Sequence, residues 1–126
     1  MSYLQRAILT ENGTEKMIYE AQSGELAVLA YQKKGIAEIN RFMLSTDMYL
    51  DNMDRPLFQC DLVQIEGLTG TFIVEFNKAK FGFIVEKEKS DEWYYLHDVF
   101  DRITNFVGTF YDDKTAGVIG EHLVTL

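Results

Sequence analysis

Hydrophobic and polar side chains alternate over short runs along most of this chain, and clusters of polar residues and glycine separate the runs. Alternation with a period of two is typical of β-strands, because successive side chains point to opposite faces of the sheet. In the run 71–76, for example, Phe72, Val74 and Phe76 fall on one face. Turn signals that recur about every ten residues, with short alternating runs between them, predict a small β-barrel or β-sandwich.

The run 81–85 continues this pattern and places Phe81, Phe83 and Val85 on one face. A polar link at 77–80 joins it to the preceding run. Two alternating runs joined by so short a link predict an antiparallel hairpin. Because both runs place phenylalanines on one side, we expect the inner face of this hairpin to be aromatic, and we expect the other strands to be arranged around it.

The first half of the chain carries a second hairpin signal. Asn12 and Gly13 lie between the strand-like runs 3–9 and 16–20, and an Asn-Gly pair in this context is the strongest short signal for a hairpin. The next run, 25–31, has mixed propensity, since its alanines and leucines favour helix while its valine and tyrosine favour strand. It is short for a helix, and we predict a strand there.

Farther along the chain the pattern is less uniform. Apolar residues in 36–49 recur at both helical and strand spacing, so both structures stay open for this region. The polar run 51–56 contains the chain's only proline and predicts a turn. We predict strands at 93–96 and 104–110, with a single helical turn between them over 97–103.

These elements predict a mainly all-β protein with at most one or two short helices. The chain has 126 residues, which is the length of one domain. We expect residues 1–45 to form a β-rich segment that packs on a barrel formed by residues 46–115. Residues 116–126 form a partly apolar tail, for which pairing at a sheet edge and pairing with another subunit both stay open.

Composition and charge narrow the class of partner. Hydrophobic residues at 47% and charged residues at 25% are close to the globular average, which argues against disorder of the whole chain. Twenty acidic and 12 basic residues give a formal net charge of −8, so there is no excess of cations to neutralise a phosphate backbone. We therefore do not expect a nucleic-acid partner. Four lysines form a candidate basic patch, which we interpret as a solvated sheet edge: Lys78, Lys80, Lys87 and Lys89.

The chain carries no sign of membrane insertion or export. No apolar run approaches the roughly 20 residues of a membrane-spanning helix, and residues 1–6 lack the apolar core of a signal peptide. The single cysteine, Cys60, excludes an intrachain disulfide and fits a reducing compartment. We expect a soluble protein of the cytoplasm without a membrane partner.

Patterns that would indicate a metal site or catalysis are missing from the sequence. Neither histidine lies at ligand spacing from the other or from Cys60. The acidic positions Asp47, Asp51 and Asp54 lack the glycine and the closing glutamate of a calcium loop. No Ser/His/Asp or Cys/His arrangement and no phosphate-binding glycine loop is recognisable. We predict no cofactor, no metal and no enzymatic activity.

The run Trp93-Tyr94-Tyr95 is the strongest candidate for a binding surface. On a strand, Tyr94 points away from the face that carries Trp93 and Tyr95, so one aromatic face lies outside the core unless another segment covers it. Aromatic side chains outside the core are enriched at protein interfaces, and we weigh exposure and coverage evenly. Together with the acidic residues around this run, the candidate protein-interaction set is Trp93, Tyr95, Asp91, Glu92, Asp98 and Asp101.

Several segments suggest a family. The segment 51–63, DNMDRPLFQCDLV, resembles the central signature of the YopX-like phage and prophage proteins, although Cys60 stands where the family has a glycine. Val-Glu-Phe at 74–76 followed by Phe-Gly-Phe at 81–83 resembles the hairpin of that family, and 106–112 resembles its closing strand. The resemblance implies an SH3-like small β-barrel that is encoded by mobile elements and has no established catalytic site.

From these observations we expect a phage- or prophage-encoded accessory protein in the cytoplasm of a bacterial host, which binds a host or phage protein and catalyses no reaction. A more specific form of this hypothesis is an acidic mimic of nucleic acid that blocks a host DNA-binding or defence protein. Two alternatives stay open. One is a nucleic-acid-binding barrel that uses the four lysines, and the other is an oligomeric scaffold in which residues 118–126 exchange with a neighbouring copy.

Overall fold

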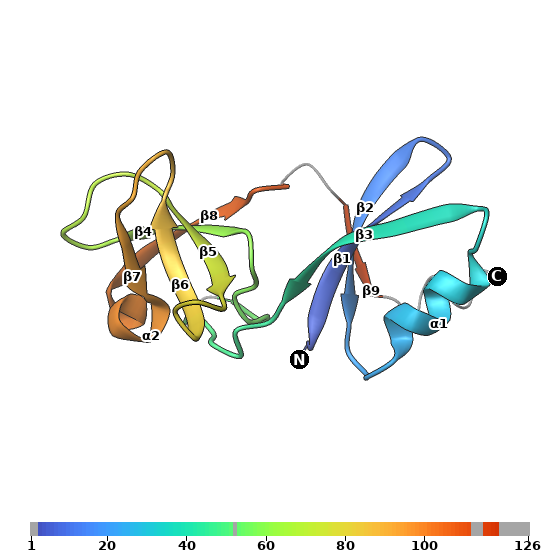
Figure 1. The fold of residues 1–126 in the computed structure, drawn as a ribbon, viewed down its shortest axis with the longest axis horizontal. Coiled ribbons are helices and arrows are strands. Elements are labelled where there is room, and N and C mark those ends of the chain that lie inside the picture. The colour runs from blue at the N-terminus through green and yellow to red at the C-terminus, as the bar shows by residue number, and fades with distance from the viewer. Residues whose placement is uncertain (1–2, 52, 112–114, 119–126) are drawn as a thin grey trace. The chain divides into compact units, whose positions relative to one another are not determined.

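A computed structural model describes residues 3–51, 53–111 and, as backbone only, 115–118. The chain is built mainly of β-strands, as the alternation predicted (Figure 1). It divides into two compact units. The first unit comprises Met1–Pro56 with Asp113–Leu126, and the second unit is Leu57–Asp112. The packing of residues 1–45 on a barrel stays a prediction.

The first unit contains a four-stranded sheet in the order β3-β1-β2-β9. Its strands are β1 (Gln5–Glu11), β2 (Thr14–Glu20), β3 (Ala37–Leu44) and β9 (Thr115–Val118). Strand β1 pairs antiparallel with both β2 and β3, and β9 runs parallel to β2 at the edge of the sheet. Strand β3 lies in the region whose spacing fitted both helix and strand. The tail residues 119–126 lie outside the described residues, so their exchange with a neighbour stays a prediction.

The hairpin predicted at Asn12 and Gly13 is confirmed. Strands β1 and β2 are joined by these two residues alone, since Glu11 pairs with Thr14. The φ angles of Asn12 and Gly13 are 54° and 78°, and both lie in the left-handed region. A two-residue hairpin loop of this kind requires positive φ at both positions, which Asn-Gly adopts at low cost.

The strand predicted at residues 25–31 is wrong, because this segment forms helix α1 (Glu25–Gln32). The Glu20 carboxylate accepts a hydrogen bond of 2.8 Å from the Leu26 backbone N–H, and so satisfies one of the free amides at the helix start. Leu26 and Leu29 are buried against the sheet of the first unit. Mixed propensity left the choice open, and this capping contact and the apolar packing decide it for helix.

The second unit contains a five-stranded antiparallel sheet in the order β7-β6-β5-β4-β8. Its strands are β4 (Asp61–Ile65), β5 (Phe72–Asn77), β6 (Gly82–Lys87), β7 (Trp93–Tyr95) and β8 (Ile103–Thr109). The two edge strands of this sheet, β7 and β8, are consecutive in the chain. The closure of this sheet into an SH3-like barrel stays a prediction.

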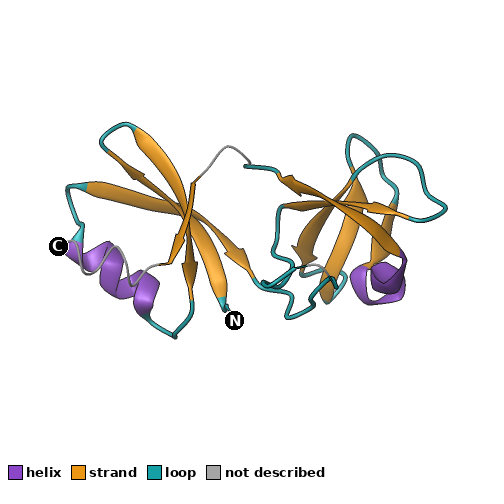
Figure 2. Cartoon of the chain, turned by 180° about the vertical axis from the view of Figure 1, so that it is seen from behind, coloured by secondary structure: helices purple, strands orange, loops and turns teal. Residues whose placement is uncertain are grey.

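A short helical connection joins β7 to β8, as the sequence predicted. It consists of α2 (Leu96–Val99) followed by a 3-10 turn (Phe100–Arg102), and Figure 2 shows it beside the strands of its unit. Leu96 and Val99 are buried. Among the helices that the structure describes, none has the length and apolar character needed to cross a bilayer.

The central hairpin predicted for β5 and β6 is confirmed, but its aromatic inner face is only partly so. Phe72 is fully buried, and the opposed Val74 and Val85 lie beside it in the core. Phe76, farther along the same face, is 39% exposed. Phe81 lies in the turn rather than in the strand, and its side chain is 93% exposed. The core therefore covers the half of the hairpin away from its turn.

Candidate interaction surface

Strand β7 presents its three aromatic side chains to both faces of the second sheet. Tyr94 pairs with Val85, and its ring centroid lies 6.0 Å from that of Phe72 on the core side. Since neighbouring strand residues point to opposite faces, Trp93 and Tyr95 lie on the outer face. Both are partly buried. The structure thus has the alternation that the sequence predicted for this run.

The outer-face rings of β7 continue into α2 and form a ladder of Trp93, Tyr95 and His97, called the aromatic ladder below. The rings of Trp93 and Tyr95 meet edge to face, with centroids 5.1 Å apart and planes inclined at 88°. The rings of Tyr95 and His97 stack at 5.5 Å and 25°. Edge-to-face and stacked rings are favoured arrangements that hold each other in place, so the ladder is a preformed surface.

A positive charge lies at one end of the aromatic ladder. The Lys80 Nζ atom is 4.6 Å from the centre of the Trp93 ring, within the range of a cation–π contact. The β5–β6 turn that carries Lys80 is held by the side chain of Asn77, whose Oδ1 accepts the Lys80 backbone N–H at 3.0 Å. Sequence reasoning placed Lys80 in a basic patch and missed this contact, because sequence spacing does not reveal which strand lies beside a turn.

Two glutamates share the outer face with the aromatic ladder. Directly opposed residues in an antiparallel pair lie on the same face. Glu86 is opposed to Trp93, and Ile84 is opposed to both Tyr95 and Glu75. The pKa of Glu75 is raised, first by burial and then by the negative charge of Glu86. Neither glutamate stands out in the sequence. Alternation in β5 and β6 places them on one face, but only the strand register brings them to Trp93.

The acidic residues predicted for the site are divided between several places. Glu92 accepts a 2.5 Å hydrogen bond from the Tyr94 hydroxyl and lies 3.8 Å from the Lys87 ammonium group. The hydrogen bond to Glu92 is the main reason that the Tyr94 pKa is raised. Asp98 lies 3.2 Å from Nε2 of His97 and so adjoins the ladder. The other two, Asp91 and Asp101, are exposed in the turns before and after β7 and α2.

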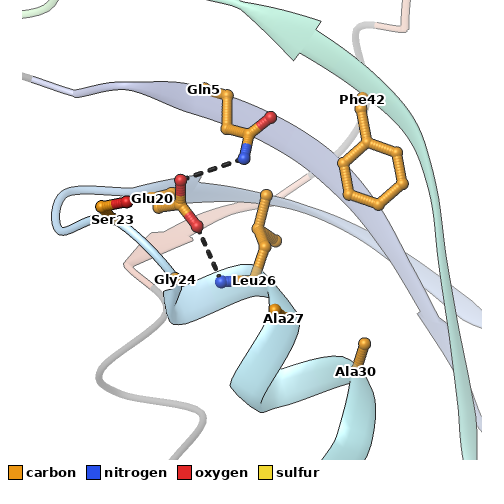
Figure 3. A pocket seen from close by; sticks show the side chains of 8 residues that line it. All are labelled: Gln5, Glu20, Ser23, Gly24, Leu26, Ala27, Ala30 and Phe42. Atoms are coloured by element: carbon orange, nitrogen blue, oxygen red, sulfur yellow. Dashed lines mark hydrogen bonds between the residues drawn. The ribbon is translucent and has the colours of Figure 1, made fainter.

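A separate pocket of about 320 Å³ lies in the first unit between α1 and the sheet (Figure 3). Figure 3 shows the buried Glu20 carboxylate between Gln5, whose amide donates at 3.0 Å, and the Leu26 N–H. One carboxylate oxygen thus caps the helix start, and the other accepts from Gln5 of the neighbouring strand β1. The lining residues are Gln5, Glu20, Ser23, Gly24, Leu26, Ala27, Ala30 and Phe42. We interpret this pocket as a packing feature of α1.

Within the residues that the structure describes, no three His, Cys, Asp or Glu side chains gather in a way that would hold a metal ion. Cys60 is partly buried, and its backbone has a φ angle of 73°. That conformation is one that glycine adopts more readily than cysteine.

Comparisons of the chain with family models, with curated proteins and with solved structures each found no match. The resemblance to the YopX-like proteins therefore stays a prediction. The surface itself offers the partly buried rings of Trp93 and Tyr95, the exposed ring of His97 and neighbouring carboxylates. The ammonium group of Lys80 lies on the Trp93 ring. This arrangement offers groups for binding a cationic or aromatic partner.

Proposed function

We propose that this protein is a non-enzymatic protein-binding module, encoded by a phage or prophage, and that its partner contacts the aromatic ladder. The observation that supports the proposal is the position of Trp93 and Tyr95 on an edge strand, on the face opposite to that of Tyr94, where both rings are partly exposed. Trp and Tyr side chains in such positions are enriched among the residues that dominate protein–protein affinity.

The charge of the second unit favours a basic partner. Residues 57–112 contain ten acidic and five basic side chains. Glu75 and Glu86 add carboxylates to the face of the aromatic ladder itself. Complementary charge raises association rates and selects the partner. A host DNA-binding or defence protein, whose basic surface this chain would occupy in place of nucleic acid, fits this chemistry.

The four lysines give little support to a nucleic-acid role. The Lys87 ammonium group lies 3.3 Å from the Thr69 hydroxyl and 3.8 Å from the Glu92 carboxylate. The ammonium group of Lys80 rests on the Trp93 ring. These two side chains are engaged within the chain, and a phosphate backbone would also meet the acidic excess around them.

The test is a pull-down from host lysate with tagged protein, with and without nuclease. We expect a stoichiometric protein band that survives nuclease and disappears with the double substitution Trp93→Ala and Tyr95→Ala. Tyr31→Ala is the control, since Tyr31 is an aromatic residue of the first unit that is 82% exposed. Glu86→Lys leaves the rings in place and is expected to weaken the same interaction.

Two results would contradict the proposal. One is a partner that the double variant retains while its circular dichroism spectrum matches that of the wild type. The other is a partner that is lost on nuclease treatment. That result would indicate that the lysines of the β5–β6 hairpin bind nucleic acid.

A further inference from the structure

The contact between Lys80 and Trp93 shows that the outer face of the second sheet holds a cation. The ammonium group is 4.6 Å from the ring centre. On the same face the register places Glu86 opposite Trp93, and Glu75 adjoins Glu86. A cation on the ring therefore has both the π-face and nearby carboxylates as sources of attraction. We call the Trp93 ring face with these two glutamates the cation seat.

The occupant of the cation seat is held weakly. Lys80 is partly buried in a turn whose residues Lys78, Ala79 and Phe81 are exposed. A lysine loses most of its rotamer freedom when its ammonium group is fixed on one ring. A partly solvated cation–π contact gains an amount of free energy comparable to this loss. We therefore expect another cation of the same chemistry to compete with Lys80 for the ring.

We propose that the cation seat binds a lysine or arginine side chain from a basic peptide segment of the partner, which displaces Lys80 from Trp93. The inference rests on the proposed function and names the chemistry that the partner brings to the aromatic ladder. Lys80 acts as an internal competitor that occupies the seat until the partner arrives. An arginine side chain fits best, because its planar guanidinium group stacks on an aromatic ring and also pairs with a carboxylate.

The probe is a short, fluorescently labelled oligo-arginine peptide, titrated with purified protein and followed by anisotropy. The emission of Trp93, the chain's only tryptophan, provides a second readout. The key variant is Lys80→Gln, which empties the seat. Its matched control is Lys78→Gln, because Lys78 is an exposed residue of the same turn and its loss changes the net charge by the same amount.

We expect Lys80→Gln to bind the peptide about two- to fivefold more tightly than Lys78→Gln, as removal of a competing cation–π contact predicts. When either lysine substitution is combined with Trp93→Leu, the two double variants should bind the peptide equally. Glu86→Gln alone should weaken binding of the peptide. Equal affinities of the two lysine variants would show that only the net charge matters and would overturn the inference. Unchanged affinity of Trp93→Leu, or no peptide binding at low salt, would overturn it as well.

These outcomes are distinct from those that test the proposed function. If the lysate partner still depends on Trp93 and Tyr95 while the two lysine variants bind the peptide equally, the inference fails and the proposed function stands. If the peptide binds as expected while no lysate protein depends on the rings, the cation seat stands and the identity of its partner must be revised.

Discussion

Lys33, at the end of helix α1, forms a salt bridge with Glu11, the last residue of β1, with 2.8 Å between Nζ and Oε2. The Lys33 side chain is only 7% exposed, whereas that of Glu11 is 25% exposed. The salt bridge thus links the end of the helix to the sheet, and both charged groups are partly removed from water. This contact lies between the limits of an exposed pair and a fully buried pair, which differ widely in energy.

Replacement of Lys33 by methionine should therefore lower the free energy of unfolding by about 2 kcal/mol, because Glu11 loses its partner at a partly desolvated site. Urea denaturation followed by circular dichroism measures this change. Lys34→Met is the control, since Lys34 is the exposed neighbour. Equal stability of the two variants would show that the salt bridge contributes nothing.

Glu20→Ala should destabilise helix α1, because it removes the acceptor of the Leu26 N–H and a negative charge near the helix start. We expect a loss of about 1–2 kcal/mol, the usual range for a helix cap. Glu38→Ala, at an exposed position of β3, should change stability much less. Hydrogen exchange of the α1 backbone amides measures the stability of the helix. Equal exchange rates of these amides in the two variants would refute the capping role.

Phe81→Gly should stabilise the β5–β6 turn. Phe81 has a φ angle of 59°, a conformation that costs an L-residue other than glycine roughly 1–2 kcal/mol. Its side chain is 93% exposed, so little packing is lost. We expect a net gain of up to about 1 kcal/mol after the greater entropy of glycine in the unfolded chain is counted. A lower melting temperature than wild type would contradict this account, and Ala79→Gly in the same turn provides the comparison.

Titration of Glu75 should make the free energy of unfolding decrease as the pH rises. Burial, and then the negative charge of Glu86, raise the folded-state pKa of Glu75 above its ordinary value of 4.5. The folded state then holds the Glu75 proton at pH values where the unfolded state has lost it, so stability decreases as the pH rises from 4.5 through the folded pKa. Glu75→Gln should therefore be more stable than wild type at neutral pH and similar to it below pH 4.5.

Unfolding experiments at pH 4 and pH 7 measure this difference. Glu88→Gln removes the same charge from an exposed position and is the matched control. A stability difference between Glu75→Gln and wild type that does not change with pH would show that titration of this carboxylate is not its cause.

Features that depend on neighbouring residues were predictable from the sequence. The β1–β2 hairpin follows from the backbone preferences of Asn12 and Gly13, which act within the turn itself. The buried face of β5 follows from the alternation that places Phe72 and Val74 on one side. The opposed directions of Trp93 and Tyr94 follow from the same rule. The sequence left exposure and coverage of the Trp93 and Tyr95 rings equally open, and the structure leaves both rings partly buried.

Features that depend on contacts between distant segments were decided only by the tertiary structure. The run 25–31 has no clear preference of its own, and it is helical because Glu20 caps it and Leu29 packs on the sheet. The cation seat requires the β5–β6 turn to bring Lys80 to Trp93 and the strand register to set Glu86 beside the ring. The sequence by itself determined the β1–β2 and β5–β6 hairpins and the two faces of their strands, because these follow from local backbone geometry. Which residues meet across the sheet depends on register and packing, which no local pattern specifies.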